Sequence, residues 1–268
     1  MHVERFESAL WQTASLLLVA DGESVAIDPC ISGAEVAAIG ARAEALEAPV
    51  THVLATHADW DHVCGIAAFP DAVAAMGERS AQAVASGAPA ATIVQRAADY
   101  ELDIAGAPRV DRVLAAGVAH RVGPFVVETL ALPGHTPDGT AYRVRALDVL
   151  AVGDHVSAVE FPFVSSTAAY RASLAALIDL LRRDPPSQIV PGHGPALSVA
   201  EALAIAEADL AYLHALREAV SAALASGASR PEARAAGLQV DPPRSATEDL
   251  AKMRTANVES QLDELSPP

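Results

Sequence analysis

The chain alternates short apolar runs with amphipathic stretches, a pattern typical of a mixed α/β protein. Apolar residues 15–20 and 24–28 flank Asp21-Gly22, a dipeptide that favours a tight hairpin turn. Residues 33–48 repeat alanine and charge at helical spacing and stop at Pro49. Residues 50–55 are mostly apolar and predict a buried strand. The first 55 residues therefore predict a hairpin, a helix and a strand, in that order.

The same kind of pattern continues to residue 190 and then changes. Further strands are predicted at 71–76, 110–114, 118–122, 125–131, 141–145, 148–152 and 187–190, and helices at 78–86, 89–102 and 169–183. Beyond residue 190 the strand patterns cease, and helices are predicted at 198–225, 232–237 and 246–264. We therefore expect an α/β domain over 1–196 and a C-terminal helical extension over 197–268 that packs on it.

Composition narrows the choice of partners. The formal net charge is −16, which repels polyanions, so we expect a small-molecule substrate and no nucleic acid partner. The apolar run Leu16 to Ala20 is far too short to span a bilayer, and no membrane partner is expected. The two cysteines, Cys30 and Cys64, are interpreted as reduced thiols, which together with the lack of a signal-peptide pattern predicts a cytoplasmic protein. The oligomeric state is left open, with a homodimer among the possibilities.

Histidines and aspartates cluster where predicted strands end. The stretch THADWDH (56–62) follows the strand at 50–55. Three further strands lead into PGHTP (133–137), GDH (153–155) and PGHG (191–194). A single histidine is more often structural than a metal ligand, but four strand ends with the same content are not expected by chance. Strand ends are also where α/β sheets place their chemistry, so these motifs favour a metal site.

With these four motifs in this order, residues from about 12 to about 196 resemble the metallo-β-lactamase superfamily. The resemblance implies a four-layer αβ/βα sandwich in the α/β class, with a C-terminal helical extension. It also implies two metal sites. The first would use His57, Asp59 and His135, the second Asp61, His62 and His193, and Asp154 would bridge them.

This resemblance implies a hydrolase in which a metal-bound hydroxide attacks the carbonyl of a small ester, thioester, lactone or lactam. Asp61 would be the catalytic residue that orients the nucleophile. The expected cofactors are two divalent ions, with zinc first. Two alternatives stay open: an iron-dependent oxidoreductase of the same fold, and a metal-binding protein without turnover.

Asp59 departs from the family motif His-x-His-x-Asp-His, which has histidine at this position. A carboxylate brings negative charge and a harder ligand atom, which shifts the preference toward iron or manganese. The flavodiiron proteins of the superfamily, which bind iron, carry a glutamate at the matching position. Asp59 is interpreted as a ligand in an altered two-metal site; a single-metal site and a degenerate site are the alternatives.

Aromatic residues near these motifs are candidates for the substrate pocket. Trp60 lies between two of the predicted ligands, and Trp11 and Gln12 precede the first predicted strand. The segment after Asp154 contains three further candidates, Phe161, Phe163 and Tyr170. Relatives build pockets in this region, although the same rings could instead anchor the helix that follows.

Overall fold

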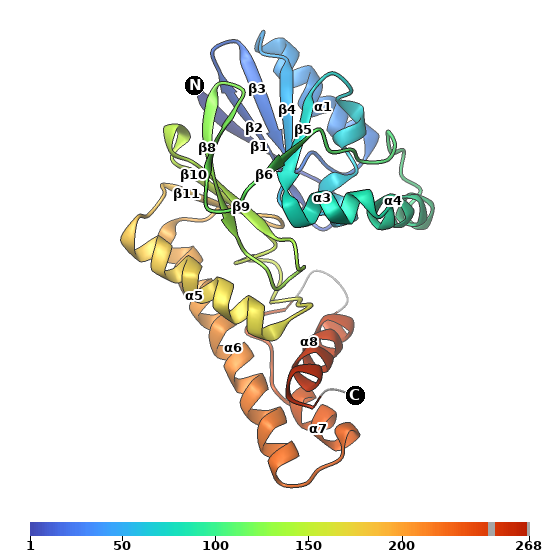
Figure 1. Cartoon of the computed structure of the whole chain (residues 1–268), viewed down its shortest axis with the longest axis vertical. Helices are drawn as coiled ribbons and strands as arrows, with labels where there is room; N and C mark the ends of the chain where they lie inside the picture. The colour runs from blue at the N-terminus through green and yellow to red at the C-terminus, as the bar shows by residue number, and fades with distance from the viewer. Residues whose placement is uncertain (246–249, 267–268) are drawn as a thin grey trace.

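The computed structural model describes residues 1–245 and 250–266, which form two β-sheets packed face to face with helices outside them (Figure 1). The first sheet has the strand order β1(His2–Glu7), β2(Ala14–Ala20), β3(Glu23–Ile27), β4(Val50–Ala55), β5(Val73–Gly77) and β6(Arg112–Leu114). The second has the order β11(Gln188–Pro191), β10(Val149–Gly153), β9(Thr140–Val144), β8(Phe125–Ala131) and β7(Ala119–Val122).

Strand β2 shows why the layers form, because its two faces contact different layers. Leu16 and Leu18 point to the second sheet and share a core cluster with Phe125 and Tyr142. The alternate residue Leu17 packs against α1(Gly33–Ala45) on the outer face. A strand that is buried on both faces needs an uninterrupted apolar sequence, and SLLLVA supplies it.

The outer face of the second sheet is covered in the same way. Leu150 of β10 and Ile189 of β11 share a cluster with Leu174 of α5(Thr167–Arg183) and Leu213 of α6(Val199–Ala225). The layers are therefore helix, sheet, sheet and helix, which confirms the predicted four-layer αβ/βα sandwich. The predicted strands and helices from 15 to 237 are present, with ends displaced by a few residues.

Besides two short 3-10 helices, one strand and one α-helix were not predicted. Strand β1 pairs antiparallel with β2 along its whole length, from His2 opposite Val19 to Glu7 opposite Ala14. Its charged residues lie at an edge of the sheet, where no apolar alternation is needed. The short helix α2(Trp60–Val63) begins inside the THADWDH stretch. Helix α3(Glu78–Ala85) lies beside β5 and β6, toward the opposite edge of the first sheet, and contacts α4(Ala88–Asp99).

The C-terminal helices extend away from the two sheets (Figure 1). They are α6, α7(Arg230–Leu238) and α8(Leu250–Leu265), and Tyr212 and Met253 join the core cluster beneath the second sheet. Residues 246–249 of the predicted last helix lie outside the described residues. The domain boundary at 196/197 stays a prediction. Within the described residues, no helix is both long enough and apolar enough to cross a bilayer.

Candidate metal centre

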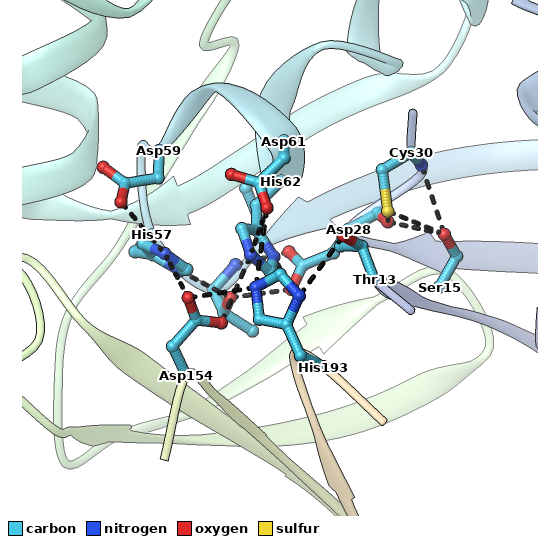
Figure 2. Close-up of polar contacts among 12 residues, drawn as sticks. Thr13, Ser15, Asp28, Cys30, His57, Asp59, Asp61, His62, Asp154 and His193 are labelled. Atoms are coloured by element: carbon cyan, nitrogen blue, oxygen red, sulfur yellow. Dashed lines mark hydrogen bonds and ion pairs between the residues drawn. The ribbon is translucent and has the colours of Figure 1, made fainter. Parts of the chain in front are cut away.

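Seven side chains that the sequence singled out meet between the C-terminal ends of strands from both sheets. Figure 2 shows Asp154 facing His57, His62 and His193. The seven follow four different strands: His57, Asp59, Asp61 and His62 follow β4, His135 follows β8, Asp154 follows β10, and His193 follows β11. The strand-end pattern in the sequence thus corresponds to one place in the fold.

Asp154 is at the middle of this cluster, and its carboxylate approaches the Nε2 atoms of all four histidines. The distances are 3.1 Å to His135, 3.2 Å to His62, 3.3 Å to His193 and 3.6 Å to His57. A carboxylate shared by four imidazoles is in the position that the predicted bridging ligand requires.

The other two carboxylates divide the histidines into pairs. The Oδ2 atom of Asp59 lies 3.3 Å from Nε2 of His135 and 3.8 Å from Nε2 of His57. The Oδ2 atom of Asp61 lies 3.4 Å from Nε2 of His62 and 3.5 Å from Nε2 of His193. Each triplet has ligand atoms within 4.8 Å of one another. The structure brings together the two predicted triplets; that they bind metal stays a prediction.

Every histidine of the cluster is held at its other ring nitrogen, Nδ1. The Nδ1 of His135 donates to the carbonyl of Phe163 at 2.7 Å, and the Nδ1 of His193 donates to the carbonyl of Trp11 at 3.1 Å. Thr56 Oγ1 lies 3.0 Å from Nδ1 of His57. Such outer contacts fix the tautomer and leave Nε2 free to bind a cation.

Asp28 completes this outer shell, and the sequence analysis missed it. Its carboxylate accepts hydrogen bonds from Nδ1 of His62 at 3.1 Å and from Oγ1 of Thr56 at 2.7 Å. Since the Thr56 hydroxyl donates to Asp28, its oxygen can accept the proton on His57 Nδ1. The available signal was the position of Asp28 directly after β3, a strand end like the other four.

The residues fit a bound cation. Among the buried side-chain atoms without a hydrogen-bond partner in the described residues are Nε2 of His57, Nε2 of His62 and Oδ1 of Asp154, all at the centre of the cluster. Orphaned buried polar atoms are costly, and atoms that converge in this way are placed to bind a cation together. A Cβ atom on Gly192 would lie 2.0 Å from Oδ1 of Asp154, so only glycine leaves this carboxylate its place.

Charge compensation within the cluster is strong. Burial opposes ionisation of Asp154, but the surrounding imidazoles, led by His193, hold the pKa of its carboxyl well below its usual range. Burial also opposes the charge on His193, yet Asp154 raises the pKa of that imidazole to about 9. In Asp59, burial is outweighed by the hydrogen bond from His135 and by nearby imidazoles, which lower its pKa to about 2. Cations could replace the protons that now balance these carboxylates.

A cavity of about 650 Å³ opens onto the cluster. Asp59, Asp61, His135, Asp154 and His193 line its floor. Of the four predicted pocket residues, Trp60 and Phe163 line this cavity. Phe161 and Tyr170 do not. The structure places both in the core, 2 % and 1 % exposed, beneath the second sheet. Apolar rings on this short segment are divided between pocket and core, and the sequence alone does not distinguish them.

The remaining histidines and the cysteines take no part in the cluster. His155 is buried, and its ring stacks on Tyr170 with centroids 4.4 Å apart. Burial lowers the pKa of His155 to about 3, so it stays neutral. Both cysteines are buried and free, and burial raises the pKa of Cys64 to about 12, as befits an inert thiol.

Comparison with known sequences gives one family. The family model described as the metallo-beta-lactamase superfamily matches residues 9–193. The hydroxyacylglutathione hydrolase of Acidiphilium cryptum (strain JF-5) is 30 % identical over 248 residues, which cover 91 % of this chain and 86 % of that protein.

Comparison with solved structures gives the same fold. A metallo-beta-lactamase family protein from Thermus thermophilus aligns with a TM-score of 0.69 at 18 % identity, covering 98 % of this chain and 92 % of its own. The protein TTHA1623 in a di-iron-bound form aligns with a TM-score of 0.58 at 23 % identity, covering 74 % of this chain and 96 % of its own. At these identities the likeness concerns the fold alone.

Proposed function

This chain belongs to the metallo-beta-lactamase superfamily, and on that premise we propose that it is a metal-dependent hydrolase of a small ester, thioester, lactone or lactam. The observation that carries the proposal is the convergence of four imidazoles and three carboxylates at the floor of a cavity. The Acidiphilium relative is named as a hydrolase, which supports the same reaction class.

Members of this fold bind divalent cations, and the buried atoms without a hydrogen-bond partner at the centre of the cluster fit such an ion. His57, Asp59 and His135 would hold one ion, and Asp61, His62 and His193 a second, with Asp154 between them. Bound cations supply Lewis acidity and make water a nucleophile near neutral pH.

The chain's own residues hold the reactants. Asp61 is 5 % exposed and lines the cavity, so its carboxylate can accept a hydrogen bond from the attacking water and fix its direction. Hydrolysis joins the water oxygen to the carbonyl carbon, breaks the bond to the leaving oxygen, sulfur or nitrogen, and delivers a proton to that atom. Glu160 also lines the cavity, and burial raises the pKa of its carboxyl. We assign it to the protonation of the leaving atom.

A panel of ester, thioester and lactone substrates tests this proposal, with the protein loaded in turn with zinc, manganese and iron. We expect turnover with at least one metal and its loss in His135→Ala. The matched control is His120→Ala on β7, whose ring lies outside the cluster and contacts the carbonyl of Ala115. Silence with all three metals would contradict the hydrolase and favour a metal-binding protein without turnover.

One observation favours an iron-dependent oxidoreductase as a second candidate. The carboxylate of Asp59 lies among the predicted ligands, and a third carboxylate suits iron better than zinc. The related fold of TTHA1623 has been solved with two iron ions. Metal analysis of protein purified without added metal separates the candidates: iron with oxygen-dependent turnover would favour the oxidoreductase, and zinc the hydrolase.

A further inference from the structure

Three aromatic rings form one side of the cavity above the predicted ligands, and we name them the aromatic wall: Trp11, Trp60 and Tyr100. Trp11 meets Trp60 edge to face at 5.3 Å and Tyr100 at 5.6 Å, while Trp60 and Tyr100 are nearly parallel at 6.1 Å. Aromatic residues make up only 4 % of the chain, yet both of its tryptophans belong to this wall. Trp60 also belongs to a core cluster against which Trp11 packs, so packing fixes both rings where they border the cavity.

The loop that carries Trp11 is strained. Trp11 has φ +58° and Gln12 has φ +54°, two consecutive non-glycine residues in the left-handed region. Their carbonyls hold the last ligand loop, since Trp11 O accepts from Nδ1 of His193 and Gln12 O accepts from the amide of Gly194 at 3.0 Å. Strain of this kind persists where the surroundings enforce it, often at binding sites. The position of the Trp11 ring is therefore tied to a predicted metal ligand.

The wall continues onto one face of α4. Pro89, Thr92, Arg96 and Tyr100 recur at helical spacing, and all four line the cavity. Tyr100 remains 37 % exposed although its ring packs on both tryptophans. A ring needed only for the core would be buried further. The surface left open combines the aromatic rings with the polar side chains of Thr92 and Arg96 on α4.

Size and chemistry together identify the occupant of this surface. A cavity of about 650 Å³ is much larger than an acetyl group needs and lies in the range of sites that hold drug-sized ligands. Aromatic walls favour flat apolar groups, which gain contact area and edge-to-face contacts. We propose that the substrate carries a bulky apolar acyl group, best an aromatic one, that lies along the aromatic wall. This inference rests on the proposed hydrolase function.

Binding can be measured without turnover, because the only two tryptophans of the chain are in the wall. Tryptophan fluorescence of protein without added metal is titrated with phenylacetamide and, for comparison, with acetamide. We expect a saturable change with phenylacetamide only, and an affinity reduced about fivefold or more in Tyr100→Ala, as expected for the loss of apolar contact. The control is Val94→Ala, on the same helix, 72 % exposed and outside the cavity lining, which should bind as the wild type does.

Turnover gives the second measurement, the ratio of kcat/KM for phenylacetyl and acetyl thioesters. We expect a ratio of about ten or more in the wild type, from the apolar area buried, and a clear fall in Tyr100→Ala and Trp11→Ala. Equal kcat/KM values, or no saturable binding of phenylacetamide, would overturn the role of the wall while leaving the hydrolase standing. Saturable binding with no turnover of any ester or thioester would contradict the hydrolase and still support the wall as a binding surface.

Discussion

At the scale of single residues, the candidate centre depends on which atom each side chain presents. All four histidines use Nδ1 for contacts with the protein, which leaves Nε2 for the centre. Asp59 stands where the family motif has a third histidine in the same loop. Its carboxylate reaches two of those Nε2 atoms, so a shorter side chain still meets the cluster. The unusual residue is therefore placed to act as a ligand.

The charge of Asp59 leads to the first prediction. Asp59→His removes a negatively charged ligand and restores an imidazole, which zinc prefers. Zinc affinity at the first site should therefore rise by about tenfold, which is the low end of the effects that substitutions around metal ligands produce. Competition against a chromogenic chelator measures the change. Asp59→Asn is the matched control, because it removes the charge without supplying an imidazole, and it should weaken zinc binding. An unchanged affinity in both variants would show that Asp59 is no ligand.

Glu160 leads to a second prediction at this scale. If its carboxyl protonates the leaving atom, Glu160→Gln should lower kcat/KM for alkyl esters by roughly a hundredfold, within the range for general acids. Esters of p-nitrophenol need no such proton and should be affected far less. Steady-state kinetics on both substrate types provides the measurement. Glu207→Gln, an exposed change on α6, is the control, and equal losses on both types would exclude the assignment.

At the scale of elements, several contacts join the C-terminal helices to the segment after Asp154, and a buried ion pair is one of them. Arg244 follows α7 and reaches back to Asp209 of α6 at 2.7 Å, where the Asp209 side chain is 1 % exposed. The same arginine donates to the carbonyl of Glu160 at 2.6 Å. Through these two contacts Arg244 joins α6 to a loop that lines the cavity.

Arg244→Ala should destabilise the fold strongly. The substitution leaves the Asp209 carboxylate buried without its partner, which typically lowers the free energy of unfolding by about 3–5 kcal/mol. Urea denaturation measures this loss. Arg182→Ala is the control, because its bond to Glu207 also joins two helices but is exposed, and it should cost about 1 kcal/mol or less. Similar losses of unfolding free energy in Arg244→Ala and Arg182→Ala would show that burial of the ion pair does not set its contribution.

The contribution of Asp209 to the free energy of unfolding depends on pH with a defined sign. Burial raises the pKa of Asp209 from 3.8 to about 6, although Arg244 opposes the shift. Between these values the folded state holds a proton that the unfolded state has lost, so this group's contribution to stability falls as pH rises from about 4 to about 6. Without Arg244 the pKa rises further. The stability deficit of Arg244→Ala should therefore shrink as pH falls from this higher pKa toward 6, and should change little below pH 6.

At the scale of the whole molecule, the candidate centre joins the two sheets. Four of the donors follow a strand of the first sheet, and three follow strands of the second. Burial disfavours charge on His62, His135 and His193, but neighbouring carboxylates, Asp154 first, raise the pKa of each, to about 9 for His193. A metal ion must displace these protons. Binding should then both stabilise the pair of sheets and release protons.

The expected result is a metal affinity that rises with pH from about 6.5 to about 9, because protons compete for the same nitrogens. Calorimetry in buffers of different ionisation enthalpy counts the protons released. Zinc at a hundred times its Kd should raise the free energy of unfolding by about 2.7 kcal/mol, and a chelator should reverse the gain. A pH-independent affinity would show that these histidines are not the ligands.

Apolar periodicity is a local feature, and it predicted β2 to β11 and most of the helices. The strand-end motifs, with the family resemblance, singled out the seven side chains that meet at the candidate centre. The sequence alone did not predict β1, whose charged edge position leaves no apolar pattern. Nor did it identify Asp28, or separate Phe163 in the cavity from Phe161 in the core. The contacts of Asp28 and the different positions of Phe161 and Phe163 depend on how each loop packs against the two sheets. Only the packing of two sheets decided them, since it brings residues more than a hundred positions apart within hydrogen-bonding distance.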